Sequence, residues 1–308
     1  MTRHMMMLAA SCLVAVALSA GIAGKAAAAD EPLSKSYRVT RAKDVEFQKF
    51  QSAKVFDNLY YVGPGYVSVW LLTTPQGDIL FDTTQEPYVD WVLDNIKKYA
   101  NPRDIKYIIL SHGHLDHFGG AAKLQAATGA RVLAVEEDWK MMDAFKARPA
   151  PVGQAVDVAP KRDMVVKEGD HLDLGDQHLI FHWTPGHTPG VLTTEGIIVY
   201  DAGKPHKAIL WGGGGYRGGL KEAEQSVQTA NAVAAIKGVE VNLQIHSWAE
   251  PVGYPGGGIN ERILMLKNRK PGDPHPMVDP TTWNNWVKRA QDESVKAVAM
   301  EKTKAAAK

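Results

Sequence analysis

Four potential metal ligands lie within six residues of the chain, at His112, His114, Asp116 and His117. His112 and His114 are two residues apart, so both side chains point to the same side in an extended segment. Asp116 and His117 are adjacent, so their side chains point in different directions. This spacing fits two neighbouring metal ions better than one, and the alternative is a histidine-rich polar loop without metal.

Two further histidines follow strand-like segments much later in the chain. His187 lies in the segment 184–190, whose two prolines and two glycines fix an unusual backbone, and His246 follows the apolar run 241–245. Loops at strand ends are where a rigid scaffold brings distant residues together. Imidazole and carboxylate ligands without sulfur suit zinc, and an open position on the ion makes such a site catalytic.

The elements that must position these residues are read from hydrophobic periodicity and turn signals. Turns at residues 64–65 and 75–78 separate three short strands, which predicts an antiparallel meander. Residues 37–50 are predicted to form a helix or an arm, and the proline-rich segment 148–160 a long loop. In the first half of the chain we predict strands 58–62, 67–73, 78–81, 105–110 and 131–135, and helices 86–99, 119–128 and 136–146.

The second half repeats this alternation. Glycine-rich loops are expected at 212–215 and 218–219. The predicted strands are 164–166, 171–174, 177–183, 197–200, 208–211 and 241–245, and the predicted helices are 220–237, 259–268 and 279–302. Two β-rich halves, each closed by helices, predict an α+β fold, a four-layer αββα sandwich in a single domain.

The first 29 residues have the pattern of a signal peptide. Arg3 is basic, residues 5–20 carry no charge, and residues 26–29 are four alanines that offer cleavage sites. A retained membrane anchor is the alternative, but the apolar run is short for a spanning helix. We therefore expect a periplasmic or secreted protein without a stable membrane anchor.

Composition limits the partners of the remaining chain. Of 308 residues, 45% are hydrophobic and 22% charged, and the formal net charge of +1 becomes −1 once Arg3 and Lys25 are removed. Such a balance gives no reason to expect nucleic acid as a partner. The only cysteine, Cys12, lies in the predicted signal peptide. The expected organisation is an N-terminal arm at 30–46, a domain at 47–278, and a C-terminal helix and tail at 279–308.

Two motifs resemble those of the metallo-β-lactamase superfamily. Its His-x-His-x-Asp-His motif corresponds to residues 112–117, and its Pro-Gly-His-Thr-Pro-Gly motif to residues 185–190. Segments 47–50, 58–62 and 76–82 are similar to the opening of the cysteine-free, histidine-rich third subclass of these lactamases. The resemblance runs from about residue 47 to residue 248 and implies a zinc-dependent hydrolase with a small-molecule substrate; the oligomeric state stays open.

The resemblance also implies a role for each ligand. His112, His114 and His187 would hold one Zn²⁺, and Asp116, His117 and His246 a second. A water shared by the two ions would lose its proton near neutral pH, because zinc lowers the pKa of water from about 16 to about 7. Asp116 would both bind metal and orient this nucleophile, as the catalytic residue. Asp82 either fixes a ligand histidine or caps a turn.

One segment departs from the pattern of the superfamily. Many of its hydrolases place a metal-bridging aspartate after the strand that corresponds to residues 208–211, where this chain has Gly212 to Gly215. This argues against the glyoxalase, lactonase and RNA-processing branches and favours the cysteine-free lactamases. The glycines also replace the Asp-Ser pair usual in those lactamases, so a different water network is expected.

The leading hypothesis is therefore hydrolysis of a cyclic amide, most simply a β-lactam, with lactones, other esters or amides as the alternative. A diiron protein of the same fold is a rival, although His114 stands where those relatives carry glutamate. A metal-binding protein without catalysis is another rival.

Other polar and aromatic residues have simpler interpretations. Surface or packing roles are expected for His178 and His182, and solvent exposure for His171, His206 and His275. Residues 136–138 are read as a solvated helix start. Four aromatic residues, Trp211, Tyr216, Trp248 and Tyr254, form either an apolar substrate wall or part of the core.

Overall fold

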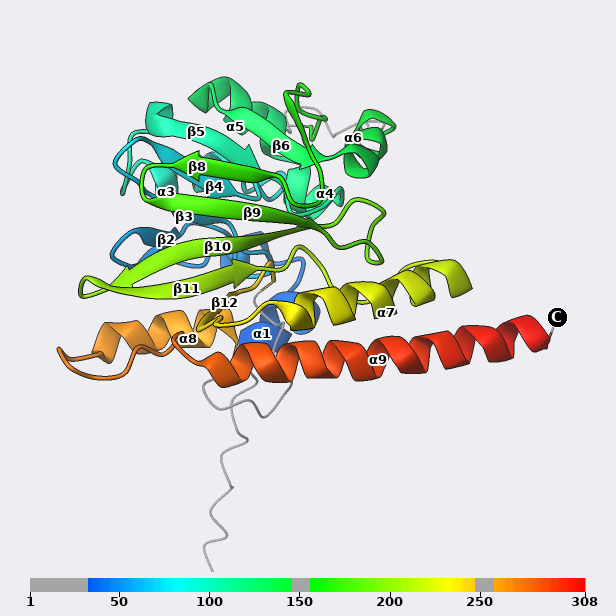
Figure 1. Cartoon of the computed structure of the whole chain (residues 1–308). Helices are drawn as coiled ribbons and strands as arrows, with labels where there is room; N and C mark the ends of the chain where they lie inside the picture. Colours follow the sequence, from blue (N-terminus) through cyan, green and yellow to red (C-terminus); the bar gives the residue numbers. More distant parts are fainter. Residues whose placement is uncertain (1–32, 146–155, 247–257, 308) are drawn as a thin grey trace, which may run out of the picture. The chain divides into compact units, whose positions relative to one another are not determined.

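The computed structural model describes residues 33–145, 156–246 and 258–307. These residues belong to one compact unit, Pro32–Lys308. Within it two β-sheets pack face to face, and helices cover both outer faces (Figure 1). The predicted α+β class and the αββα sandwich are confirmed. The predicted signal peptide lies outside the described residues, within which no helix has the length and apolar character needed to cross a membrane.

The first sheet has seven strands in sequence order. Strands β2 to β4 form the predicted three-stranded antiparallel meander, β1 adds a fourth antiparallel strand, and the pairs from β4 to β7 are parallel. Its strands are β1 (Ala53–Phe56), β2 (Leu59–Tyr61), β3 (Trp70–Leu72), β4 (Asp78–Phe81), β5 (Ile105–Ile109), β6 (Arg131–Val135) and β7 (Met164–Val166). The helices of this half are α3 (Val89–Ile96), η2 (Pro102–Asp104), α4 (Leu115–Phe118), α5 (Ala121–Thr128) and α6 (Glu136–Asp143).

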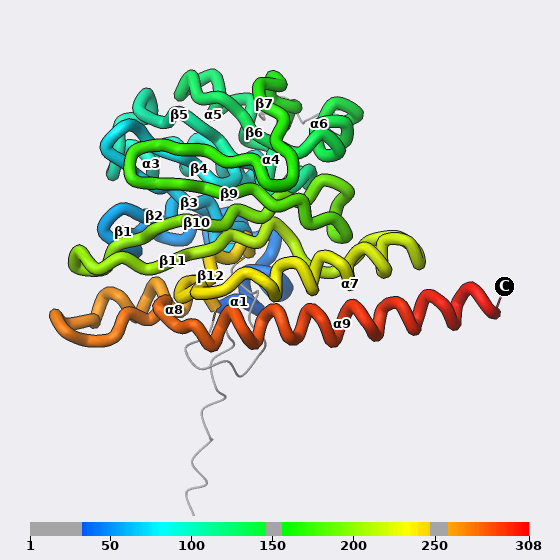
Figure 2. The backbone as a smooth tube through the Cα atoms, in the orientation of Figure 1, coloured from blue at the N-terminus to red at the C-terminus, as the bar shows by residue number. Residues whose placement is uncertain are grey.

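The second sheet has five strands in the order β12-β11-β10-β9-β8, with only the β11–β12 pair parallel. Its strands are β8 (His171–Leu174), β9 (Gln177–Trp183), β10 (Leu192–Asp201), β11 (Lys204–Leu210) and β12 (Val241–Leu243). Its helices are α7 (Leu220–Ala235), α8 (Ile259–Met265), η3 (Leu266–Asn268) and α9 (Pro280–Ala306). The tube in Figure 2 shows α7 and α9 running side by side below this sheet.

Three apolar clusters hold the layers together. The central cluster lies between the sheets and includes Trp70, Phe81 and Phe181. A second cluster packs the first sheet against its helices, and a third packs α7 and α9 against the second sheet through Trp211 and Trp283. Burial of these large side chains is the main stabilising contribution of the fold, about 1.5–3 kcal/mol for each one.

The N-terminal arm is more closely attached than its polar sequence suggests. It forms three short helical segments, α1 (Leu33–Lys35), η1 (Ser36–Thr40) and α2 (Val45–Gln48). Tyr37 stacks on Phe47 with ring centroids 4.6 Å apart and belongs to the central cluster. This contact fixes the segment that carries Arg38, whose guanidinium contacts the ring of His246.

The sequence missed β1 and the first half of β10. Gly196 explains the second difference, since its φ of +84° accompanies a register shift between Thr194 and Ile197 that lets the strand continue through a polar stretch. The expectation of solvated histidines was wrong for His206 and His275, which are 4% and 6% exposed. His206 pairs with Glu240, and His275 stacks on Phe56.

Candidate metal centre

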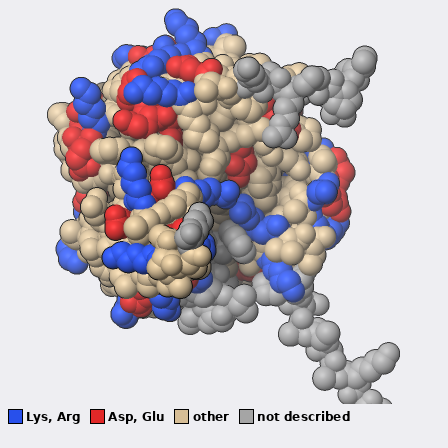
Figure 3. Space-filling view, turned by 90° about the vertical axis from the view of Figure 1, so that its right-hand side faces the viewer, with Lys and Arg blue, Asp and Glu red and all other residues tan. Residues whose placement is uncertain are grey.

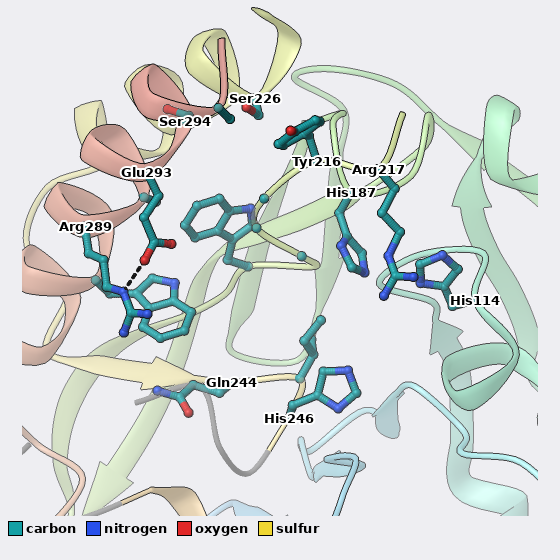
Figure 4. Close-up of a pocket in the computed structure, with 18 of the residues that line it drawn as sticks. His114, His187, Tyr216, Arg217, Ser226, Gln244, His246, Arg289, Glu293 and Ser294 are labelled. Atoms are coloured by element: carbon teal, nitrogen blue, oxygen red, sulfur yellow. Dashed lines mark hydrogen bonds and ion pairs between the residues drawn. The ribbon is translucent and has the colours of Figure 1, made fainter. Parts of the chain in front are cut away.

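The six predicted ligands come together as two groups of three. One group is His112, His114 and His187, and the other is Asp116, His117 and His246; within each group the ligand atoms lie within 4.8 Å of one another. They come from the ends of β5, β9 and β12 and from the short helix α4. Figure 4 shows His114, His187 and His246 facing one cleft. The fold therefore produces the juxtaposition that the spacing suggested.

In the first group the ring nitrogens converge. His112 Nε2 lies 2.9 Å from His114 Nδ1, and the ring of His187 is centred 4.8 Å from each of the other two rings. His112 is buried, whereas His114 and His187 are partly exposed toward the cleft. The group is thus fixed on its inner side and open to small molecules on its outer side.

In the second group two imidazoles and a carboxylate converge. His117 Nε2 lies 3.2 Å from His246 Nε2, and Asp116 Oδ2 lies 3.6 Å and 3.7 Å from these two nitrogens. The rings of His112 and His117 are centred only 4.0 Å apart, so the two groups are direct neighbours. Two adjacent cation sites fit this arrangement.

One buried carboxylate holds a histidine of each group in place. Asp82 Oδ2 accepts hydrogen bonds from His117 Nδ1 at 2.8 Å and from Ser111 Oγ at 2.7 Å, while its Oδ1 accepts from Ser111 N. Ser111 Oγ then lies 3.1 Å from His112 Nδ1 and can accept its proton. With both Nδ1 atoms protonated, the Nε2 lone pairs of His112 and His117 point inward. Of the two roles considered for Asp82, the structure supports positioning of a ligand histidine.

His246 is oriented from the N-terminal side of the chain. Its Nδ1 lies 2.8 Å from the carbonyl oxygen of Tyr66 and 2.7 Å from Arg38 Nη1. The carbonyl oxygen can only accept and the guanidinium can only donate, so the two contacts hold the ring in place from opposite chemical sides, and its Nε2 faces Asp116 and His117. No local pattern points to Arg38 or Tyr66, because both contacts span about two hundred residues.

Burial keeps most of these imidazoles neutral. It lowers the pKa of His114 to about 4 and, together with the nearby His114 and Arg217, that of His187 to about 3. Burial and the neighbouring histidines also hold the pKa of His112 well below its usual range. Neutral imidazoles have free lone pairs, which is the state a metal ion requires.

The charges in the second group are balanced differently. Burial opposes ionisation of Asp116, but His117, His246 and Arg38 outweigh it and lower the pKa of this carboxyl. Burial also disfavours a charged His117, yet Asp116 and Asp82 together raise its pKa. An ionised carboxylate beside two imidazole nitrogens concentrates negative potential where a cation would bind.

Asp138 links the two histidine-bearing loops. It was expected in a solvated helix start, but it is 1% exposed. Its Oδ2 accepts from Gly113 N at 2.6 Å and from Thr188 Oγ1 at 2.8 Å, and its Oδ1 accepts from Gly190 N at 2.9 Å. Burial raises the pKa of this carboxyl, and these hydrogen bonds act in the opposite direction. Asp138 thereby joins the His112–His114 loop to the His187 loop.

The first two glycines after β11, Gly212 and Gly213, leave no room for a side chain. A Cβ at Gly212 would lie 2.2 Å from the carbonyl oxygen of Leu192 and 2.6 Å from that of Ser111. A Cβ at Gly213 would lie 3.0 Å from the ring of His187, and Gly213 has a φ of +154°. The close approach of this backbone to the ligands thus requires glycine.

The metal centre opens into a cleft of about 730 Å³. Arg38 and Arg217 flank its ligand-bearing end, and Figure 4 shows Arg217 reaching from the glycine-rich loop toward His114. On the face shown in Figure 3, a run of Lys and Arg side chains crosses the middle. Trp211 and Tyr216 line the cleft, whereas Trp248 and Tyr254 lie outside the described residues.

The remaining predicted surface histidines lie away from this centre. His178 pairs with Asp173, and His182 lies between Glu168 and Glu195 at 3.0 Å and 2.9 Å. His171 is exposed, as expected. Among the described residues, the carboxylate partners of His178 and His182 are Asp173, Glu168 and Glu195, none of which is a candidate ligand.

Comparisons with known proteins agree with this geometry. Residues 62–196 match the family model described as the metallo-beta-lactamase superfamily. Hydroxyacylglutathione hydrolase of Pseudomonas syringae pv. syringae is 27% identical over 125 residues, which are 40% of this chain. The alignment spans only 39% of that relative's own length.

Solved structures match over far more of the chain. BJP-1 of Bradyrhizobium japonicum, a subclass B3 metallo-β-lactamase, aligns with a TM-score of 0.69 and 27% identity, covering 84% of this chain and 98% of its own. FEZ-1 of Legionella gormanii aligns with a TM-score of 0.69, 24% identity and coverages of 82% and 97%, which supports the fold. The family model thus identifies residues 62–196 as a metallo-beta-lactamase domain, and the αββα sandwich as a whole is similar to solved structures of subclass B3 metallo-β-lactamases.

Proposed function

We propose that this protein is a dizinc hydrolase that opens a cyclic amide, most simply a β-lactam. One observation carries the proposal: two neighbouring groups of ligands converge at the base of a cleft whose rim is cationic. The similarity to BJP-1, a subclass B3 metallo-β-lactamase, supports the choice of substrate.

The donor set fits zinc. The Nδ1 atoms of His112 and His117 face the acceptors Ser111 Oγ and Asp82 Oδ2, which directs their Nε2 lone pairs toward the centre. These Nε2 atoms lie 2.9 Å from His114 Nδ1 and 3.2 Å from His246 Nε2. Five imidazoles with one carboxylate are ligands that Zn²⁺ accepts. His112, His114 and His187 would hold one ion, and Asp116, His117 and His246 the other.

Bound zinc would supply an activated water and polarise the carbonyl of the substrate. The chain itself provides orientation and proton handling. Asp116, ionised and partly exposed to the cleft, is placed to bind metal and to accept a proton from the attacking water. Asp82, Ser111 and Asp138 keep the imidazoles in their tautomers and positions, so no reorganisation is needed during reaction.

The two arginines at this end would recognise an anionic group of the substrate. Arg217 and Arg38 line the same end of the cleft as His114 and His187. A guanidinium binds carboxylate in a planar, bidentate manner. A β-lactam carries a carboxylate close to its reactive amide, which fits this placement.

Lactones, other esters and amides form the alternative substrate class, since the same machinery would attack their carbonyl carbon. The similarity to hydroxyacylglutathione hydrolase supports this alternative. The first two glycines after β11, which leave no room for a side chain, favour the cyclic amide.

We further propose a periplasmic or secreted location, supported by the signal-peptide pattern of residues 1–29. Cell fractionation with an antibody against the purified protein tests this, and recovery of an unprocessed chain in the cytoplasm would contradict it.

The proposed activity is tested on purified protein loaded with two equivalents of zinc. We expect turnover of a chromogenic cephalosporin that disappears on chelation and returns with added zinc, and little turnover of a panel of lactones and thioesters. Absence of cephalosporin turnover at full zinc occupancy contradicts the proposal, and turnover of one of the other panels would identify the alternative.

A further inference from the structure

The cleft has a second end, away from the metal centre, that the proposed chemistry does not use. Its far wall is formed mainly by α9, with contributions from α7, β12 and Trp211. Trp286, Ala290, Glu293 and Ala297 line it from α9. Their spacing of three and four residues places them on one side of the helix. Figure 4 shows this face of α9 opposite His187 and His246.

Two buried hydrogen-bond donors at this end have no partner among the described residues. They are Trp211 Nε1 and Asn242 Nδ2, in side chains that are 5% and 6% exposed. Both residues line the cleft. A buried donor without an acceptor costs about 1–3 kcal/mol, so an oxygen atom that reached either donor would be bound favourably.

The far wall is otherwise neutral and aromatic. Its one arginine, Arg289, donates from Nε to Glu293 Oε1 at 2.7 Å, so its charge is balanced within the helix. The aromatic rings of Trp211 and Trp286 line this end together with the small side chains of Ala290 and Ala297. The two ends of the cleft therefore differ, with cations and metal ligands at one end and tryptophans with neutral donors at the other.

We propose that this face of α9 is a specificity subsite that takes a neutral, aromatic acyl-amide arm of the substrate. The ring would pack on Trp286 and Trp211, and the amide oxygen would accept from Asn242 or Trp211. The anionic group and the reactive carbonyl would lie at the other end, near Arg217 and the ligands. The orientation of the substrate in the cleft rests on the proposed hydrolase function. The preference of the subsite for an aromatic arm can be measured by binding alone, without turnover.

The test compares two variants of the same helix. Ala290→Trp fills the subsite, whereas Ala299→Trp adds the same bulk at an exposed position that does not line the cleft. Benzylpenicillin and 6-aminopenicillanic acid serve as probes because they differ by the phenylacetyl arm. We expect Ala290→Trp to lower kcat/KM about tenfold or more for benzylpenicillin and less than twofold for 6-aminopenicillanic acid. Ala299→Trp should change neither value.

Two further measurements distinguish loss of the subsite from misfolding of the variant and from absence of the proposed activity. Asn242→Leu removes a donor at similar volume and should raise KM for benzylpenicillin several-fold with kcat little changed. Calorimetric titration of the metal-free protein with phenylacetylglycine and N-acetylglycine measures the arm preference without hydrolysis. We expect tighter binding of phenylacetylglycine, and loss of this preference in Ala290→Trp but not in Ala299→Trp.

The outcomes separate the two proposals. If no β-lactam is hydrolysed but the aromatic preference depends on Ala290, the substrate assignment fails and the subsite stands. If β-lactams are hydrolysed but the two tryptophan variants behave alike in turnover and in titration, the subsite proposal is overturned.

Discussion

The two ends of the cleft use their buried polar groups in opposite ways. At the metal centre, Asp82 and Asp138 are saturated with hydrogen bonds from the ligand-bearing loops. At the α9 end, Trp211 Nε1 and Asn242 Nδ2 lack partners among the described residues. A fully hydrogen-bonded network fixes the positions of its side chains, whereas an unpaired donor gains a hydrogen bond when an acceptor binds. Under the proposed function, the first end would carry out the reaction and the second would select the substrate.

The two ends of the cleft also come from different parts of the sequence. The matched family segment, 62–196, contains five of the six candidate ligands and both buried aspartates. Most of the α9 end comes from residues beyond 196. His246 is the exception, because it contributes to the metal centre from beyond the matched segment. The candidate ligands thus lie mostly in the segment that matches the family model, and we expect the substrate to be selected by the rest of the chain.

The largest expected effect is at the ligands themselves. Asp116→Ala should lower kcat/KM for the best substrate by about 10³-fold or more, because metal activation supplies several kcal/mol. Zinc per chain, measured by elemental analysis, should fall from two to one. Ala299→Trp serves as the control, and full activity of Asp116→Ala would show that the second ligand group is not used.

Next in size is the loss of Asp138, which supports the ligands without touching metal. Asp138→Ala removes three hydrogen bonds between two loops, and loss of such outer contacts typically costs 10–100-fold in metal affinity. Competition with a fluorescent zinc chelator measures it. Glu137→Ala, a neighbouring carboxylate in the same helix turn, should leave zinc affinity unchanged. Equal effects of the two variants would mean that Asp138 has no special role.

A smaller effect is expected at the cationic rim. Arg217→Ala should raise KM for an anionic β-lactam about tenfold with kcat little changed, because a charge-assisted hydrogen bond contributes about 1.5–3 kcal/mol. Arg217→Lys should recover part of the loss, and higher salt should reduce the difference. The matched control is Arg289→Ala at the other end of the cleft; a rise in KM as large as that of Arg217→Ala would remove the distinction between the two ends.

The smallest effect concerns stability alone. Burial raises the pKa of Asp78, at the start of β4, to about 6. The native state therefore binds this proton more tightly than the unfolded chain, so stability falls as pH rises from about 4 to about 6. Asp78→Asn removes the penalty and should raise the free energy of unfolding at pH 7.5 by about 1–2 kcal/mol, with little gain at pH 4.

Urea denaturation at the two pH values measures this change, with Asp94→Asn on the exposed side of α3 as control. Zinc content and turnover should stay as in the wild type, since Asp78 lies away from both ends of the cleft. A gain that was equal at both pH values would show that the ionisation of Asp78 is not its cause.

Much of this protein follows from local sequence. Strands such as β4, β6 and β9 were predicted at their observed bounds, since short apolar or alternating runs between turn residues admit few other conformations. The six ligands were also predictable, because four lie in one motif and His187 in another. His246 required the resemblance to a known family together with its place after a strand.

The tertiary structure decided the residues whose role depends on distant partners. Asp138 reads locally as a solvated helix start, yet it bonds to Thr188 and Gly190 some fifty residues away. His206 and His275 are buried only because Glu240 and Phe56 are brought beside them. A hydrogen bond across such separations leaves no periodic pattern in the sequence.

The candidate metal ligands at residues 112–117 and the αββα layers were predictable from the sequence, since ligand spacing and hydrophobic period are local properties. The surroundings of these ligands depend on tertiary packing. Packing between remote segments produces the contact of Arg38 with His246 and the hydrogen bonds of Asp138 to two loops. It also places α9 along the cleft. These contacts form because burial of apolar surface between whole layers stabilises the fold. No single stretch of residues carries that information.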